Sequence, residues 1–140
     1  MPEISPERSR YDDPRRLRDL LGKACDLASA HALGSVVVGL AGVEGDVEFP
    51  EIVDYVESAL RVDDSLFRMT RERAVVLLTD VDDKRAAEIV ERLLNDFREN
   101  FPSTTLPAIS IGYYAVTPGG DFASAKRVLP QIFAVPPQLH

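Results

Sequence analysis

Two short apolar runs that lie very close together in the sequence constrain the fold of this chain most. Residues 65–69 and 74–79 have the length and composition of strands, and only four residues separate them. Such a short separation favours a direct antiparallel connection over a crossover. The sequence therefore predicts a β-hairpin with its tip at residues 70–73.

Apolar residues at helical spacing flank this hairpin on both sides. Three helices are predicted: residues 13–32, which Asp13 caps and Gly34 closes; residues 50–61; and a helix that begins at Asp82 or Asp83 and that Pro102 stops. Further apolar runs predict strands at residues 35–41 and 108–116. A short helical segment follows at residues 122–129, and Pro130, Pro136 and Pro137 forbid a long final helix.

After the first helix, this order reads β-α-β-β-α-β. It predicts an α/β fold of the α+β type, a ferredoxin-like palm in which helices cover an antiparallel or mixed sheet, with an extra N-terminal helix. A length of 140 residues suits one domain. We expect a flexible segment at residues 1–12, the domain at residues 13–130 and a proline-rich tail at residues 131–140. The sequence leaves open whether this domain stands alone or belongs to a longer regulator.

Charge and cysteine content exclude several classes of function. A net charge of −7 argues against non-specific nucleic-acid binding, which requires a concentrated basic surface. The single cysteine, Cys25, excludes an internal disulfide and a multi-cysteine metal site. Neither a membrane span nor a signal-peptide core is evident, so we expect a cytoplasmic protein without a membrane partner.

The hairpin region resembles the GGDEF, or diguanylate cyclase, domain. In that family the hairpin reads R-x-x-D, five residues, G-G-D/E-E-F, and then an apolar strand. Here Arg61 and Asp64 stand at the R-x-x-D positions, and five residues separate Asp64 from Thr70. The residues at the signature itself are Thr70, Arg71, Glu72, Arg73 and Ala74. Residues 110–113 match the S-I-G-[VYI] strand of the family, and the similarity is best over residues 51–116.

The resemblance also implies that catalysis has been lost. Active members hold Mg²⁺ with an aspartate at the first strand and an acid of the signature, because Mg²⁺ requires oxygen ligands. Alignment places Gly39 and Ala41 at the two acidic positions of that strand, and Arg73 replaces the catalytic glutamate. Only Glu72 remains at a metal-binding position. We therefore expect no catalytic residue, no metal site, no cofactor and no cyclase activity.

The R-x-x-D motif forms a product-binding, inhibitory-type site in this family. The resemblance implies that Arg61 donates to guanine O6 and N7, and that Asp64 accepts from the N1–H and N2–H₂ groups. Arg92 stands where family members carry a second arginine, off the apolar stripe of its helix. These three residues predict binding of cyclic di-GMP, with the signal passed to a partner protein or by self-association.

Interpretations in which these residues have only a structural role stay open. Asp64 can satisfy backbone donors of its turn, Arg61 can complement the end of its helix, and Glu88 with Arg92 can form an i,i+4 ion pair. The domain would then be an interaction or dimerisation module that binds no nucleotide. Arginines at the hairpin tip suggest solvated surface or attraction to an anion: Arg68, Arg71 and Arg73.

Overall fold

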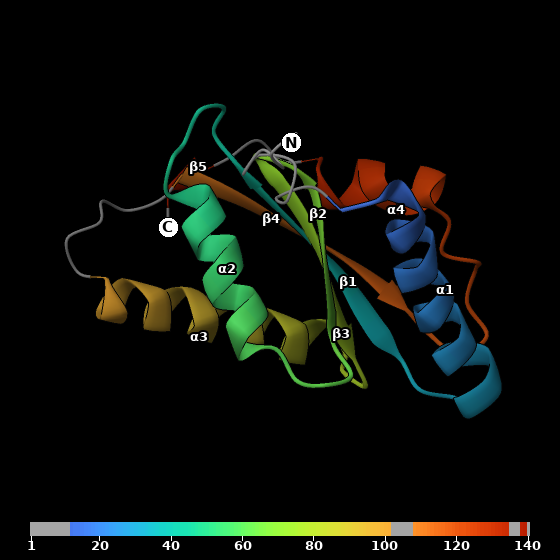
Figure 1. Cartoon of the computed structure of the whole chain (residues 1–140). Coiled ribbons are helices and arrows are strands. Elements are labelled where there is room, and N and C mark those ends of the chain that lie inside the picture. Colours follow the sequence, from blue (N-terminus) through green and yellow to red (C-terminus); the bar gives the residue numbers. More distant parts are fainter. Residues whose placement is uncertain (1–11, 102–107, 135–137, 140) are drawn as a thin grey trace, which may run out of the picture.

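An antiparallel sheet with helices on both faces forms the domain (Figure 1). The computed structural model describes residues 12–101, 108–134 and 138–139. Its strands are β1 (Ser35–Gly42), β2 (Ser65–Thr70), β3 (Arg73–Thr79), β4 (Ala108–Val116) and β5 (Gln138–Leu139), in the spatial order β2-β3-β1-β4-β5. Every neighbouring pair is antiparallel. The predicted palm is confirmed, with the short β5 added beside β4 at the edge of the sheet.

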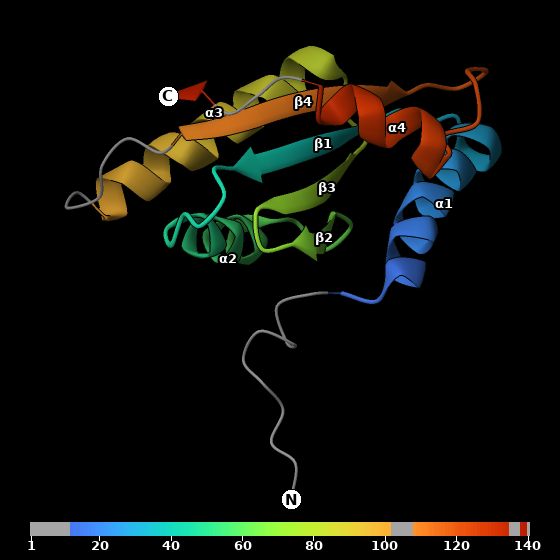
Figure 2. The ribbon, with the colours of Figure 1, turned by 90° about the horizontal axis from the view of Figure 1, so that it is seen from above.

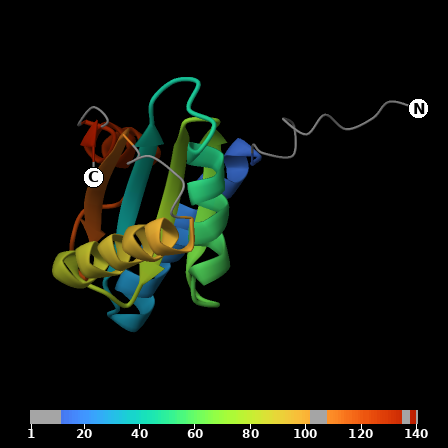
Figure 3. The same ribbon diagram turned by 90° about the vertical axis from the view of Figure 1, so that its left-hand side faces the viewer.

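The helices divide between the two faces of the sheet (Figures 2 and 3). They are α1 (Pro14–His31), α2 (Phe49–Ala59), α3 (Asp83–Asn100) and α4 (Ala125–Ile132). Successive side chains of β1 point to opposite faces of the sheet and contribute to two hydrophobic cores. Val36 and Val38 pack with α2 and α3, while Val37 packs with α1 and α4. Each face of the sheet is therefore covered by two helices. Within the described residues, no helix has the length and apolar character needed to span a bilayer.

The predicted ends of α1 and α3 are set by local capping. Asp13 accepts a hydrogen bond from the Arg15 backbone N–H at 2.9 Å, and Asp82 accepts one from Arg85 at 2.8 Å. At the other end of α1, however, Ala32 and not Gly34 takes the left-handed conformation, with φ 53°. The Ala32 N–H donates to the Leu27 carbonyl, and this bond satisfies an end carbonyl of the helix.

Two predicted boundaries around the hairpin were wrong by a small margin. Helix α2 ends at Ala59, because Leu60 already has an extended backbone with ψ 150°. Arg61 therefore lies in the turn after the helix and not at its end. Thr70 pairs with Arg73 across the hairpin, so the strands run further than expected and only Arg71 and Glu72 connect them.

Helix α4 differs from the predicted segment at residues 122–129. It begins after Ser124 and continues through Pro130 to Ile132. A proline removes one backbone donor but does not prevent helix formation in a last turn that packing stabilises, and Val128 and Ile132 are both buried. The helix is short, as expected. Pro102, Pro136, Pro137 and residues 1–11 lie outside the described residues.

Two facing glycines allow α4 to approach the sheet. Gly39 of β1 pairs with Gly112 of β4. A Cβ atom on Gly39 would lie 2.8 Å from atoms of Ile132, and one on Gly112 would lie 2.2 Å from the Ile132 carbonyl oxygen. The end of α4 therefore occupies the space that side chains at these two positions would need.

Candidate functional site

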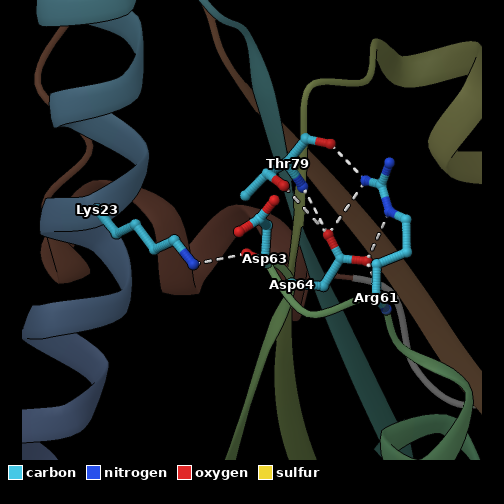
Figure 4. Close-up of polar contacts among 5 residues, drawn as sticks. All are labelled: Lys23, Arg61, Asp63, Asp64 and Thr79. Carbon is cyan, nitrogen blue, oxygen red and sulfur yellow. Dashed lines mark hydrogen bonds and ion pairs between the residues drawn. The ribbon is translucent and has the colours of Figure 1, made fainter.

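The R-x-x-D turn is held by a buried carboxylate (Figure 4). The Asp64 side chain is only 3% exposed, and it accepts hydrogen bonds on both oxygens. Arg61 donates from Nε to Oδ2 and from Nη2 to Oδ1, each at 3.1 Å. The Thr79 backbone N–H donates to Oδ1 at 3.0 Å, and the Arg61 N–H donates to Oδ2 at 3.2 Å. Asp64 thus ties the turn before β2 to the end of β3.

Arg61 is held on one side and open on the other. Besides the pair with Asp64, its Nη2 donates to the Thr79 carbonyl. The Arg61 side chain nevertheless remains 54% exposed, and Nη1 has no hydrogen-bond partner among the described residues. Arg61 thus has a fixed guanidinium group with donors directed away from the protein's own contacts. It does not bond to the carbonyl end of its own helix.

Burial and bonding act in opposite directions on the pKa of Asp64. Burial raises the pKa, while the hydrogen bonds from Arg61 and from the Thr79 N–H, together with the charge of Arg61, lower it. The bonds prevail, so the pKa of Asp64 lies below its usual value. The Asp64 carboxylate in turn raises the pKa of Arg61. The pair is charged at neutral pH.

A depression of about 180 Å³ adjoins this turn. Its charged lining residues are Arg61, Asp64, Asp80, Arg85 and Arg92. The three residues that sequence comparison selected thus line one surface, contributed by the turn after α2 and by α3. Asp80 and Arg85 also line the depression, although the sequence analysis did not assign them to this site.

Arg92 is exposed on α3 and is free to meet a ligand. Within the described part of the chain it forms no ion pair or hydrogen bond. The alternative ion pair between Glu88 and Arg92 is absent there, because Glu88 pairs with Arg85 at 3.4 Å. The depression is lined by three arginines and two aspartates, and Asp64 is already neutralised by Arg61. With Arg85 paired to Glu88, one positive and one negative lining side chain stay without an ion pair in the described residues, namely Arg92 and Asp80.

A contact from α1 reaches the same turn (Figure 4). Lys23 Nζ donates to the carbonyl oxygen of Asp63 at 2.6 Å. The Asp64 N–H closes the turn by donating to the Arg61 carbonyl at 3.0 Å. The R-x-x-D turn is therefore fixed from three sides, by α1, by β3 and by its own backbone.

The residues at the signature positions lie at the other end of the hairpin. Arg71 lines a small cavity of about 40 Å³ beside Phe49 and Val53 of α2, and its Nε is buried with no partner among the described residues. Glu72 lies close to the backbone of the loop after β1, where Gly45 N is 3.4 Å from Oε1. Arg73 lies over the Phe133 ring, 4.9 Å from its centroid.

Arg68 is not the solvated residue that was expected at the hairpin tip. Its side chain is 19% exposed and bridges to Asp54 at 2.8 Å and to Glu57 at 2.9 Å, both on α2. Its backbone N–H also donates to the Asp12 carboxylate at 2.8 Å. These bonds raise the pKa of Arg68 and lower that of Glu57. Arg68 therefore joins β2 to α2 and to Asp12, which precedes the N-cap of α1.

Comparison with known families decides what kind of domain carries these features. The family model described as "Diguanylate cyclase, GGDEF domain" matches residues 42–128. The chain belongs to the GGDEF family. In this GGDEF domain, the R-x-x-D turn and the signature positions both fall within the matched residues. No curated protein sequence matches the chain.

Solved structures of GGDEF domains share the fold. The FimX GGDEF domain of Pseudomonas aeruginosa is 14% identical with a TM-score of 0.70, covering 94% of this chain and 91% of that one. A diguanylate cyclase protein of Thermotoga maritima is 18% identical with a TM-score of 0.69, covering 90% and 95%. The GGDEF domain of DgcB from Caulobacter crescentus, in complex with c-di-GMP, is 11% identical with a TM-score of 0.59, covering 86% and 84%.

Proposed function

We propose that this GGDEF domain is a non-catalytic receptor for cyclic di-GMP. The ligand binds in the depression beside the R-x-x-D turn, with Arg61, Asp64 and Arg92 as its site residues. Occupancy is then passed to a partner signalling protein or transmitted by self-association. The observation that carries this proposal is the presence of all three residues on the lining of one depression.

Open arginine donors at the depression support a nucleotide with phosphate groups as ligand. Arg61 presents Nη1 from a fixed guanidinium, and Arg92 is exposed without a partner in the described residues. Arginine binds phosphate oxygens and guanine O6 and N7 with paired hydrogen bonds. The DgcB domain of similar fold has been solved in complex with c-di-GMP. The fold and these donors together favour this ligand for the present domain.

The size of the depression supports self-association. At about 180 Å³ it is smaller than the range of about 300–1,000 Å³ that encloses a drug-sized ligand. It can take one base or phosphate, while the rest of a dinucleotide stays outside. A ligand with two guanines can therefore bridge two copies of this site, and binding would then stabilise the dimer by linkage.

The signature region supports a loss of catalysis. Gly39 offers no carboxylate, and Ile132 occupies the space that a side chain there would need. Arg71 fills the position of a signature glycine, and Arg73 has the opposite charge to a catalytic glutamate. The residues present do not fit a Mg²⁺ pair, which requires several oxygen ligands. Within the described ranges, no three acidic, histidine or cysteine side chains are grouped to hold a metal.

Absence of cyclase activity is directly measurable. We expect the purified domain, mixed with GTP and either Mg²⁺ or Mn²⁺, to form no cyclic di-GMP above the protein-free background. The product is followed by liquid chromatography. Turnover that rises in proportion to protein concentration would contradict the proposed loss of catalysis, while leaving ligand binding at the depression untouched.

An interaction module without a ligand is the second candidate function. It is favoured by the state of Asp64, whose two oxygens already accept bonds from Arg61 and Thr79. A carboxylate engaged in this way fulfils a structural role whether or not a nucleotide binds. The fold alone supports both functions.

Titration calorimetry with cyclic di-GMP separates the two candidates. We expect the wild type to bind at tens of micromolar ligand or below, and Arg92→Ala to bind about tenfold more weakly, because a charge-assisted hydrogen bond contributes roughly 1.5–3 kcal/mol. Arg92 is the clean choice, since its removal leaves no buried group unpaired. Arg61→Ala should also lose affinity, but this change also removes the ion-pair partner of the buried Asp64.

Arg98→Ala is the matched control, because it removes an arginine from the same helix outside the lining of the depression. It should bind like the wild type. If the wild type shows no heat of binding, the interaction module replaces the receptor. If Arg92→Ala and Arg98→Ala weaken binding equally, the ligand binds elsewhere.

A further inference from the structure

Asp80 is an acid of the depression that remains available to a ligand. It lies in the turn between β3 and α3 with φ 55°, a left-handed conformation that aspartate tolerates better than most residues. Its side chain is exposed, lines the depression, and has no hydrogen bond or ion pair among the described residues. Asp80 is close enough to Arg61 for its charge to contribute to the raised pKa of that guanidinium.

The Asp64 carboxylate is not available to accept hydrogen bonds from a nucleobase. Its side chain is 3% exposed, and each oxygen already accepts at least two hydrogen bonds from the protein. A guanine that bonded to this carboxylate would have to displace Arg61 or leave the Thr79 N–H without an acceptor. The free energy lost in this way would cancel what the new hydrogen bond contributes. The available acceptor and the buried acceptor are thus different residues.

We propose that Asp80 is the acceptor that selects guanine at this site, and that Asp64 is a positioning residue that holds Arg61. This inference rests on the proposed function. Guanine presents acceptors at O6 and N7 and donors at N1–H and N2–H₂, so it requires both a donor and an acceptor from the protein. The open Nη1 of Arg61 supplies the donor. The exposed Asp80 carboxylate supplies the acceptor.

The same arrangement discriminates against adenine. Adenine has no N2 amino group, and its N1 is a hydrogen-bond acceptor. If adenine were placed opposite Asp80, the N1 atom and the carboxylate would both be acceptors without a donor. A site that hydrogen-bonds a specific group rejects analogues that lack it, because its own polar group is left unpaired. Specificity for guanine would then depend on Asp80, while affinity for the phosphates would depend on the arginines.

Calorimetry with two ligands tests this assignment. The probes are cyclic di-GMP and cyclic di-IMP, which differ only in the N2 amino group of each base. We expect the wild type to prefer cyclic di-GMP on the order of tenfold. Asp80→Gly suits the left-handed backbone and should bind both ligands with equal affinity. Asp83→Ala is the control, since it removes an exposed acid of the next helix that does not line the depression.

The outcomes of this test are separable from those of the proposed function. If the wild type binds neither ligand, the receptor function itself fails. If the wild type binds and Asp80→Gly keeps the preference for cyclic di-GMP, Asp80 is not the selecting residue and this inference is overturned. Loss of the preference in Asp83→Ala as well would assign the effect to general charge, and would equally overturn it.

Discussion

Replacing Gly39 by aspartate should destabilise the domain by about 4 kcal/mol or more instead of creating a metal site. A Cβ atom at this position would lie 2.8 Å from the Ile132 side chain and from its carbonyl oxygen. Overpacking of this kind costs about 1–3 kcal/mol, and a buried carboxylate without a partner adds to it. Since a domain is typically stable by only about 5–15 kcal/mol, much of the folded population would be lost. Urea unfolding followed by circular dichroism measures the change.

Two further variants make this result interpretable. Gly39→Ala carries the steric part alone and should cost about 1–3 kcal/mol, so it reports the contact even if the aspartate variant does not fold. Gly22→Ala is the control, because a Cβ there meets nothing within 4 Å and Gly22 lies inside α1. It should stabilise the domain by about 0.5–1 kcal/mol. A Gly39→Asp protein that is as stable as the wild type, or that Mn²⁺ stabilises, would contradict our account.

The sequence predicted the fold well where local pattern determines it. The apolar stripe of α3 is buried at Ala86, Val90, Leu93 and Phe97, and the caps at Asp13 and Asp82 are formed as expected. These features depend on residues a few positions apart, which periodicity and residue type describe directly. The resemblance to the GGDEF family likewise rested on short motifs around the hairpin, and the family model then showed the membership.

The sequence was less informative where distant residues meet. The α4 contact with Gly39 and Gly112 joins segments far apart in the chain, and it explains why Pro130 is tolerated inside a helix that packing stabilises. Arg68 was expected to be solvated, but Asp54 and Glu57 of α2 bind it. Such partners depend on tertiary packing, which no local pattern encodes.

For the candidate site, the sequence selected residues but not their chemical states. It placed Arg61, Asp64 and Arg92 together, and all three line the depression. It did not indicate that Asp64 would be buried against Thr79, because that contact depends on where the end of β3 lies beside the turn. The exposed Asp80 became a candidate only once its position beside Arg61 was known. The ligand roles of these residues stay predictions.

Replacing Asp64 by alanine should cost about 3 kcal/mol of stability, whatever ligand the domain binds. The change leaves the Thr79 N–H without its acceptor and breaks the ion pair with Arg61. Removing one partner of a fully buried pair costs about 3–5 kcal/mol, and the half-exposed Arg61 can regain water, which favours the lower end. Asp63→Ala is the matched control. Its side chain is exposed on the same turn, so the change should stay within about 0.5 kcal/mol.

The pH dependence of this loss provides a signature that a merely steric effect lacks. Because the pKa of Asp64 is lowered on folding, the folded state favours the carboxylate more than the unfolded chain does. Its contribution is therefore fully present above the usual carboxyl pKa of about 4 and is lost as the pH falls through the lower, folded value. The stability difference between wild type and Asp64→Ala should shrink between about pH 5 and pH 2 in urea titrations. A difference that stays constant over this range would show that the charge of Asp64 does not hold the turn, and Asp64 would then no longer explain the fixed position of Arg61.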